Sequence, residues 1–190
     1  IISQYFWPEN LKINDVAKGL IARGHNVSVL TGLPNYPKGK FFDGYSFPKN
    51  KKENYEGITI YRSPVIPRGN GSSVRLFLNY LSLAFLASIR VLFIKNKFDR
   101  IFVYEASPVT IGIPAIIAKY RFNAPIYFWV QDLWPESIIA ASNVQSESIQ
   151  KWVGKLVKFI YLKSDLIFVS NYDFKYSIIE KGISSEKIKF

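Results

Sequence analysis

The chain has 190 residues, of which 48% are hydrophobic, so it can bury the core of a full domain. It carries 25 Lys and Arg against 14 Asp and Glu, and the resulting formal charge of +11 favours anionic partners such as nucleic acid, acidic lipid headgroups or phosphorylated small molecules. The absence of cysteine excludes disulfides and thiolate metal sites, and the single histidine excludes a metal centre built from several histidines.

The beginning of the chain predicts a strand, a helix and a second strand. Residues 1–5 read as a short strand that is broken at Pro8, because proline cannot donate to a sheet ladder. Residues 13–23 place apolar side chains at helical spacing, and Gly24 follows where a left-handed C-cap favours glycine. Residues 27–30 form the second strand, which makes the opening typical of a parallel α/β unit.

The rest of the chain alternates between strands and helices. Residues 31–57 are too long for a plain connection and predict a functional loop. Further strands are expected at 58–61, 100–104, 126–130, 166–169 and from 187, and helices at 74–94, from Pro108, from Pro135, at 147–163 and at 172–181. This order predicts one α/β domain with a Rossmann-like, doubly wound parallel sheet of about seven strands.

Unusual polar and aromatic residues gather in the loops that follow the predicted strands. In open parallel sheets, ligands bind outside the carboxyl ends of the strands. The residues that fall there are Trp7, Glu9, Asn35, Tyr36, Glu105, Gln131, Asp132 and Glu136. We interpret this concentration as a ligand-binding rim, and the alternative is that the prolines and aromatics only fix the shape of the loops.

The segment WVQDLWPES, residues 129–137, ends one of these strands. Gln131 and Asp132 fall where the strand reaches the edge of the sheet, so their polar groups can point into a crevice. Pro135 suits the first turn of a following helix and Glu136 complements its dipole, which predicts a structural role for Glu136. For Asp132 two interpretations stay open, namely a ligand-facing acid and a helix N-cap.

Two common nucleotide-binding motifs are missing from the sequence. The loop after the first predicted strand lacks G-x-G-x-x-G, and the chain lacks G-x-x-x-x-G-K-[ST]. A self-contained dinucleotide or P-loop site is therefore disfavoured. His25 lies between the predicted C-cap and the second strand, far from the rim, and is expected to be structural.

A long apolar helix is predicted over residues 74–94. Arg75, Asn79, Ser82 and Arg90 interrupt it, which argues against a transmembrane span. These polar side chains share one arc of the helix and leave a wide apolar surface. That surface either packs on the sheet or dips into a membrane interface, and both interpretations stay open.

Four segments together resemble the N-terminal half of a family 4 glycosyltransferase with the GT-B architecture. They are SQYFWPEN (3–10), RGHNVSVLTG (23–32) running into PNYPKGKFFDGY (34–45), LNYLSLA (78–84) and WVQDLWPES (129–137). The most similar subgroup comprises transferases that add a deoxyamino sugar during bacterial capsule and O-antigen synthesis. The resemblance implies that residues 1–190 are the N-terminal Rossmann-like domain, which mainly holds the acceptor. The C-terminal donor-binding domain would lie outside this chain, and the chain alone is expected to be inactive.

The resemblance also implies a reaction and a set of roles. It implies a retaining transfer from a nucleotide sugar, with neither a metal ion nor another cofactor. Gln131 would orient the donor sugar, and Asp132 would bind acceptor hydroxyls or stabilise positive charge at the anomeric centre. The predicted substrate-binding residues are Trp7, Glu9, Asn10, Lys12, Asn35, Tyr36, Lys38 and Glu105.

The implied acceptor is a lipid-linked sugar, which places the protein in the cytoplasm, peripherally on the inner face of the bacterial plasma membrane. Two alternatives stay open. One is another GT-B enzyme, such as a sugar-nucleotide epimerase, which needs no acceptor. The other is a basic module that binds nucleic acid or membrane. The sequence shows no nucleic-acid-binding motif, so nucleic acid is not an expected partner.

Overall fold

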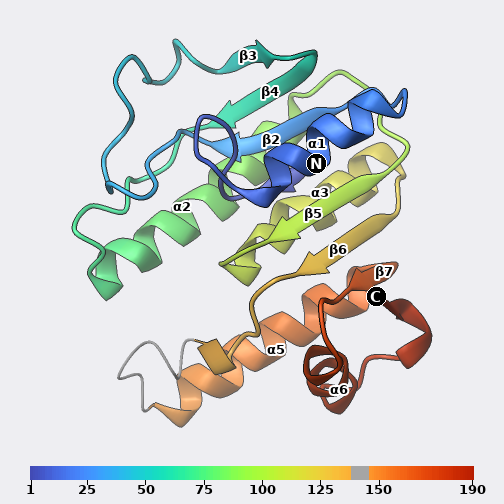
Figure 1. The fold of residues 1–190 in the computed structure, drawn as a ribbon. Coiled ribbons are helices and arrows are strands. Elements are labelled where there is room, and N and C mark those ends of the chain that lie inside the picture. The colour runs from blue at the N-terminus through green and yellow to red at the C-terminus, as the bar shows by residue number, and fades with distance from the viewer. Residues whose placement is uncertain (138–145) are drawn as a thin grey trace.

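The computed structural model describes residues 1–137 and 146–190, and in these residues eight strands form one sheet (Figure 1). The strand order is β3-β4-β2-β1-β5-β6-β7-β8, and all neighbours are parallel except β3 and β4. The strands are β1 (Ile2–Ser3), β2 (Ser28–Gly32), β3 (Lys52–Tyr55), β4 (Ile58–Ser63), β5 (Ile101–Glu105), β6 (Ile126–Val130), β7 (Leu166–Phe168) and β8 (Ile188–Lys189). The predicted Rossmann-like α/β fold is confirmed.

Helices cover both faces of this sheet. They are α1 (Lys12–Ala22), α2 (Ser73–Leu92), α3 (Gly112–Phe122), α5 (Glu147–Lys163) and α6 (Tyr172–Glu180), with short 3-10 turns at Val109–Ile111 and Ser185–Lys187. Helix α1 lies in front of the sheet and α2 and α3 lie behind it (Figure 1). The helix expected from Pro135 falls largely on residues outside the described ranges.

The core consists of two buried apolar clusters, one on each side of the sheet. On the α1 side, Ile13 and Ala17 pack with Val29 and Ile60. The cluster on the other side is larger and joins α2, α3 and α5 to the central strands. Strands buried on both faces are expected to be continuous apolar runs, as in IYFWV of β6, and this is why the sequence indicated them clearly.

The sheet has one strand more than the sequence predicted. Strand β3, inside the loop expected over 31–57, pairs antiparallel with β4 through a tight turn at Glu56 and Gly57, which both have positive φ angles. Such a turn matches the twist of a two-residue hairpin. The prediction missed β3 because its sequence, KENY, is polar and lies at the edge, where a strand buries little surface.

Helix α2 buries Asn79 and Ser88 against the fold, whereas Arg75 is exposed. Within the described residues it is the one helix whose length and composition would allow it to cross a membrane, and a third of the relevant window is buried inside the fold. Asn79, Leu83 and Ala87 are buried against the fold, whereas Phe77 and Phe85 are 60% and 66% exposed. The apolar surface noted in the sequence therefore divides into a buried part and an exposed part.

Candidate functional site

Several loops meet at one edge of the sheet, where the parallel strands end. In Figure 1 the arrowheads of β4, β5 and β6 point to this edge, and the N-terminal end of α2 lies beside it. Trp7 follows β1, Asn35 follows β2, Glu105 ends β5 and Asp132 follows β6. The structure thus brings to one edge the loops that the sequence predicted as a rim.

Glu9 joins the loop after β1 to the loop after β2. Its side chain is almost completely buried, and its Oε1 accepts hydrogen bonds from the backbone N–H groups of Asn35 (2.8 Å) and Tyr36 (2.7 Å). Its Oε2 accepts a third from the N–H group of Phe6 at 3.2 Å. Burial raises the pKa of Glu9 to about 7, and the three backbone hydrogen bonds oppose that rise. Glu9 therefore holds the two loops together, and its predicted contact with substrate stays a prediction.

Asn35 and Asn79 extend this network to α2. The side-chain oxygen of Asn35 accepts hydrogen bonds from the N–H group of Arg68 (3.2 Å) and from the amide of Asn79 (3.5 Å). Asn79 also donates to the carbonyl of Ile66 at 2.6 Å, and its oxygen accepts from Gln4 at 2.9 Å. Because both asparagines are buried, these bonds fix the loop between β4 and α2 against the sheet edge.

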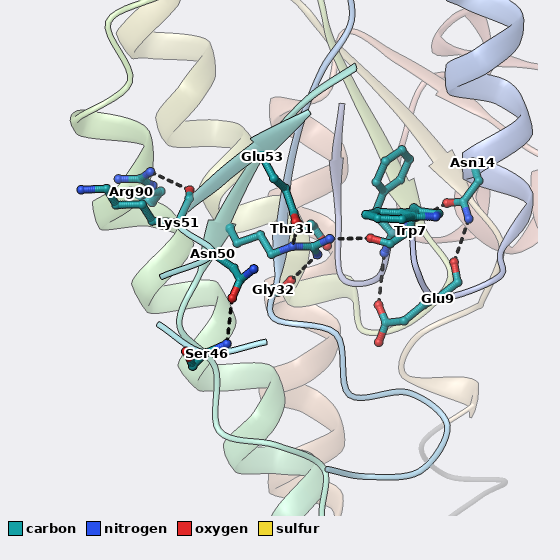
Figure 2. Close-up of polar contacts among 12 residues, drawn as sticks. Trp7, Glu9, Asn14, Thr31, Gly32, Ser46, Asn50, Lys51, Glu53 and Arg90 are labelled. Carbon is teal, nitrogen blue, oxygen red and sulfur yellow. Dashed lines mark hydrogen bonds and ion pairs between the residues drawn. The ribbon is translucent and has the colours of Figure 1, made fainter. Parts of the chain in front are cut away.

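Arg62 connects the same loops to the edge strand β3. This fully buried side chain donates to the backbone carbonyls of Trp7 and Gly32 and pairs with the Glu53 carboxylate. Figure 2 shows these three acceptors converging on one guanidinium group. The indole of Trp7 stacks on Tyr55 with ring centroids 4.2 Å apart, so Trp7 closes the β3 side of the edge.

Arg68 lies at the surface of the edge between two tyrosines. Its guanidinium donates to the Tyr5 hydroxyl at 2.7 Å and lies over the Tyr36 ring, 5.1 Å from the centroid. Burial raises the pKa of Tyr5 above its ordinary value, so its hydroxyl stays neutral. Among the described residues, no carboxylate lies within 4.0 Å of the Arg68 guanidinium. The tyrosines hold this cation in place without neutralising it.

Glu105 is buried at the end of β5, where its surroundings favour the neutral form. Within the described part of the chain neither carboxyl oxygen has a hydrogen-bond partner. Burial, followed by the charge of Asp132, raises the pKa of Glu105 well above its ordinary value, while the nearby N–H groups of Asp132 and Gln131 lower it without reaching hydrogen-bond geometry. Burial and Glu105 likewise raise the pKa of Tyr161, whose hydroxyl also has no partner among these residues.

Gln131 and Asp132 lie directly after β6, partly exposed at the edge. The Gln131 amide donates to the Ser170 hydroxyl at 3.1 Å, which ties the ends of β6 and β7 together. Asp132 accepts a hydrogen bond from the indole N–H of Trp134 at 3.1 Å, and Trp134 packs edge-on against Tyr80 of α2. The indole of Trp134 therefore fixes the orientation of the Asp132 carboxylate.

The remaining predicted residues lie on the rim itself. Asn10, Lys12 and Lys38 are exposed, with Lys12 at the first position of α1. Their contact with substrate stays a prediction. Glu136 pairs with Lys181, the C-cap residue of α6, and its expected role at the helix dipole stays a prediction.

Three important residues were not identified from the sequence. Arg62 lies in β4, one residue beyond the strand expected at 58–61, and Arg68 lies in the loop between β4 and α2, where the sequence analysis named no residue. Asn79 was noted only as a polar interruption of an apolar helix. The residues that they contact are far away in the chain, so no local pattern identifies these contacts. The one signal in the sequence was a polar residue within an apolar run.

Comparisons with known proteins agree with the fold. Three crystal structures of Anabaena Alr3699/HepE, in complex with UDP and glucose, with UDP, and with UDP-glucose, superpose with a TM-score of 0.50 at 12–13% identity. The superposition covers 99% of this chain and 42% of the HepE chain, so the chain spans less than half of that protein's length. No curated protein matched the sequence. The model of the glycosyl transferase 4-like domain matches residues 11–190, and the chain therefore belongs to this family of glycosyltransferase domains.

Proposed function

We propose that this chain is the acceptor-binding part of a retaining glycosyltransferase. In this proposal the enzyme transfers a sugar, of the deoxyamino type, from a nucleotide sugar to a lipid-linked glycan in bacterial capsule or O-antigen synthesis. It works peripherally at the cytoplasmic face of the plasma membrane and requires neither a metal ion nor another cofactor.

The observation that carries the proposal is the family match together with the placement of Gln131 and Asp132. Both lie partly exposed at the carboxyl edge of the sheet, to which the loops after β1 and β2 also belong. This is the edge at which α/β sheets of this class bind ligands.

The likeness to HepE supports a nucleotide sugar as partner. Those structures contain UDP, UDP with glucose, or UDP-glucose. The fold of this chain corresponds to less than half of each HepE chain. Since the superposition covers 42% of HepE, we propose that most contacts to the nucleotide lie outside the residues described in this structure.

The local chemistry fits transfer between two bound sugars. Glutamine cannot act as a base, so Gln131 would orient a sugar hydroxyl through its amide. Asp132, held by the Trp134 indole, would accept hydrogen bonds from acceptor hydroxyls or stabilise positive charge at the anomeric carbon. Glu105 lies close to Asp132, and burial favours the neutral form of its carboxyl group. This neutral form limits the electrostatic repulsion between the two acids. The main task of the site would be to align two substrates and exclude water.

A product analysis tests the proposal. The protein expressed from its intact gene is incubated with UDP-sugars, including deoxyamino sugars, with and without membrane lipids that carry a diphosphate-linked sugar. The proposal expects sugar to appear in the lipid fraction with its anomeric configuration retained. Conversion of the nucleotide sugar without any acceptor would instead support the epimerase alternative, and absence of any conversion with all donors would contradict both.

A further inference from the structure

Two glycines bring positively charged side chains together beside the proposed site. The N–H group of Gly69 donates to the carbonyl of Gly39 at 2.7 Å. Gly39 has a φ of +74°, and an added Cβ would lie only 1.7 Å from the Gly69 oxygen, so no larger residue fits there. The stem of Arg75 lies against Gly69, since a Cβ on that glycine would be 3.4 Å from it. The loop after β2 and the start of α2 therefore meet at this contact.

Four cationic residues lie next to this contact, three as chain neighbours of the glycines and Arg75 through its stem; they are Lys38, Lys40, Arg68 and Arg75, and we call them the cationic rim. Lys38 and Lys40 flank Gly39, and Arg68 precedes Gly69. None of the four has a carboxylate of the described residues within 4.0 Å. Like charges that gather without a neutralising acid favour an anionic ligand, and planar guanidinium groups suit phosphate oxygens.

An exposed apolar stripe of α2 begins at the same place. Its residues recur mostly at every third or fourth position, apart from the adjacent Phe77 and Leu78, and therefore share one side of the helix: Val74, Phe77, Leu78, Leu81, Phe85, Ile89 and Leu92. At 1.5 Å per residue the stripe is about 27 Å long. It starts next to Arg75 and runs away from the edge of the sheet, as the course of α2 in Figure 1 shows.

The far half of the stripe opens into a groove between α2 and α3. Its volume is about 410 Å³, and its walls are almost entirely apolar. The principal lining residues are Leu81, Phe85, Ile89 and Leu92 of α2 and Ile113 and Ile117 of α3. Exposed apolar surface of this extent is costly in water and is typical of a binding surface.

We propose that the cationic rim and the apolar stripe form one subsite for a phosphorylated lipid. The phosphate groups bind Arg68 and Arg75, with Lys38 and Lys40 nearby, and the hydrocarbon chain runs along the stripe into the α2–α3 groove. The charge favours a phosphate head over a neutral one, and the continuity of rim and stripe favours a single amphiphile over two separate ligands. This inference rests on the proposed function, because it names where the lipid of the acceptor binds.

Calorimetric titration of the chain with three probes tests whether head and chain act together. The probes are farnesyl diphosphate, farnesol and inorganic diphosphate. We expect farnesyl diphosphate to bind at least tenfold more tightly than either of the other two. If inorganic diphosphate binds as tightly as farnesyl diphosphate, the stripe does not hold the chain and the proposal is wrong.

Matched variants test the residues. Arg68→Gln and Arg75→Gln should each weaken farnesyl diphosphate binding at least fivefold and leave farnesol binding unchanged. Arg121→Gln, an exposed arginine at the C-terminal end of α3 and therefore at the opposite edge, is the control and should bind like the wild type. If Arg68→Gln does not fold, Arg75→Gln still tests the proposal, because Arg75 is exposed on α2 and its replacement should not disturb the fold. An equal loss in Arg121→Gln would show a general charge effect and overturn the assignment.

The hydrocarbon part has its own pair of variants. Phe85→Ser should weaken binding of farnesyl diphosphate and farnesol alike, whereas Phe159→Ser, on the exposed face of α5, should have no effect. Vesicles of phosphatidylglycerol provide a further arm. If Arg68→Gln loses vesicle binding but keeps farnesyl diphosphate binding, the rim recognises a membrane surface and the proposal fails. Normal lipid binding without any sugar transfer would contradict the proposed function and leave this subsite intact.

Discussion

The two sides of the carboxyl edge of the sheet are built differently. On the side of β1, β2 and β4, the buried polar groups of Glu9, Asn35 and Asn79 are joined by hydrogen bonds. On the side of β5 and β6, the carboxyl of Glu105 and the hydroxyl of Tyr161 are buried with no partner among the described residues. The first side is organised to keep loops in one shape, and the second carries an energetic cost of the kind found at functional sites.

The difference matters because stability and function place opposite demands on buried acids. Glu9 sits in a place where three N–H groups need an acceptor, so removing it should hurt the fold. Glu105 sits where no donor is aligned, so replacing its unpaired carboxyl group by an apolar group should help the fold. The sign of the stability change therefore distinguishes the two sides.

The largest effect is expected for Glu9→Ala. The variant leaves three N–H groups without their acceptor, at a cost of about 1–3 kcal/mol each. Part of this cost is offset because the buried carboxylate is also removed. We therefore expect the free energy of unfolding to fall by about 4 kcal/mol. Urea unfolding measures it. Glu180→Ala, at the exposed end of α6, serves as the control and should unfold like the wild type. A loss of less than about 1 kcal/mol would mean that Glu9 does not hold the loops.

The pH dependence of stability gives a second test of Glu9. Its pKa is raised from 4.5 to about 7, so the folded state holds a proton that the unfolded state has already lost. The contribution is fully present below pH 4.5 and is lost as the pH rises to about 7, which amounts to about 3 kcal/mol. Glu9→Gln cannot ionise, and its melting temperature should therefore fall less between pH 5 and pH 8. A slope equal to that of the wild type would exclude Glu9 as the source.

A smaller effect of opposite sign is expected for Glu105→Met. The apolar side chain fills a similar volume without an unpaired polar group, so stability at pH 8 should rise by about 2 kcal/mol. Because the pKa of Glu105 is raised in the folded state, the advantage of the variant should grow as the pH rises. Thermal unfolding at several pH values follows it. Destabilisation by Glu105→Met would indicate that the carboxyl has a partner in solution.

The smallest change in stability is expected for Ser82→Ala, at the solvent-exposed margin of the hydrogen-bonded side. Ser82 accepts a hydrogen bond from the N–H group of Ile66 at 3.0 Å, in a partly solvent-accessible place. Water can replace the hydroxyl in Ser82→Ala, so we expect a loss of about 0.5–1 kcal/mol. Asn79→Ala, which removes a buried member of the same loop anchor, should cost clearly more. Equal losses of stability in the two variants would contradict the expectation that buried hydrogen bonds of this anchor contribute more than exposed ones.

The sequence predicted the fold better than the site. Continuous apolar runs such as those of β5 and β6 identify buried parallel strands, and Gly24, with a φ of +85°, ends α1 as expected. Strand β3 was missed because its polar residues carry no such signal. The loops of the rim could be located because they follow strand ends.

The roles of individual rim residues depend on contacts that no local pattern contains. Glu9 was predicted from its position to touch substrate, but its partners Asn35 and Tyr36 are 26 and 27 positions away and enclose it. Arg68 acquires its importance from Tyr5, 63 positions away. Local periodicity cannot reveal which side chain faces inward at such a meeting of loops.

The central claim is that the carboxyl edge of the sheet is where sugar transfer takes place. It is tested most directly by comparing Asp132→Asn with Asp99→Asn, which lies just before β5 and hence at the opposite edge. The measurement is the rate of transfer from nucleotide sugar to lipid-linked acceptor by the protein expressed from its intact gene, with folding checked by circular dichroism. We expect Asp132→Asn to lower the rate by about 100-fold, in the range found for a lost electrostatic contact to a transition state, and Asp99→Asn to leave it unchanged. Equal rates in the two variants would contradict the account.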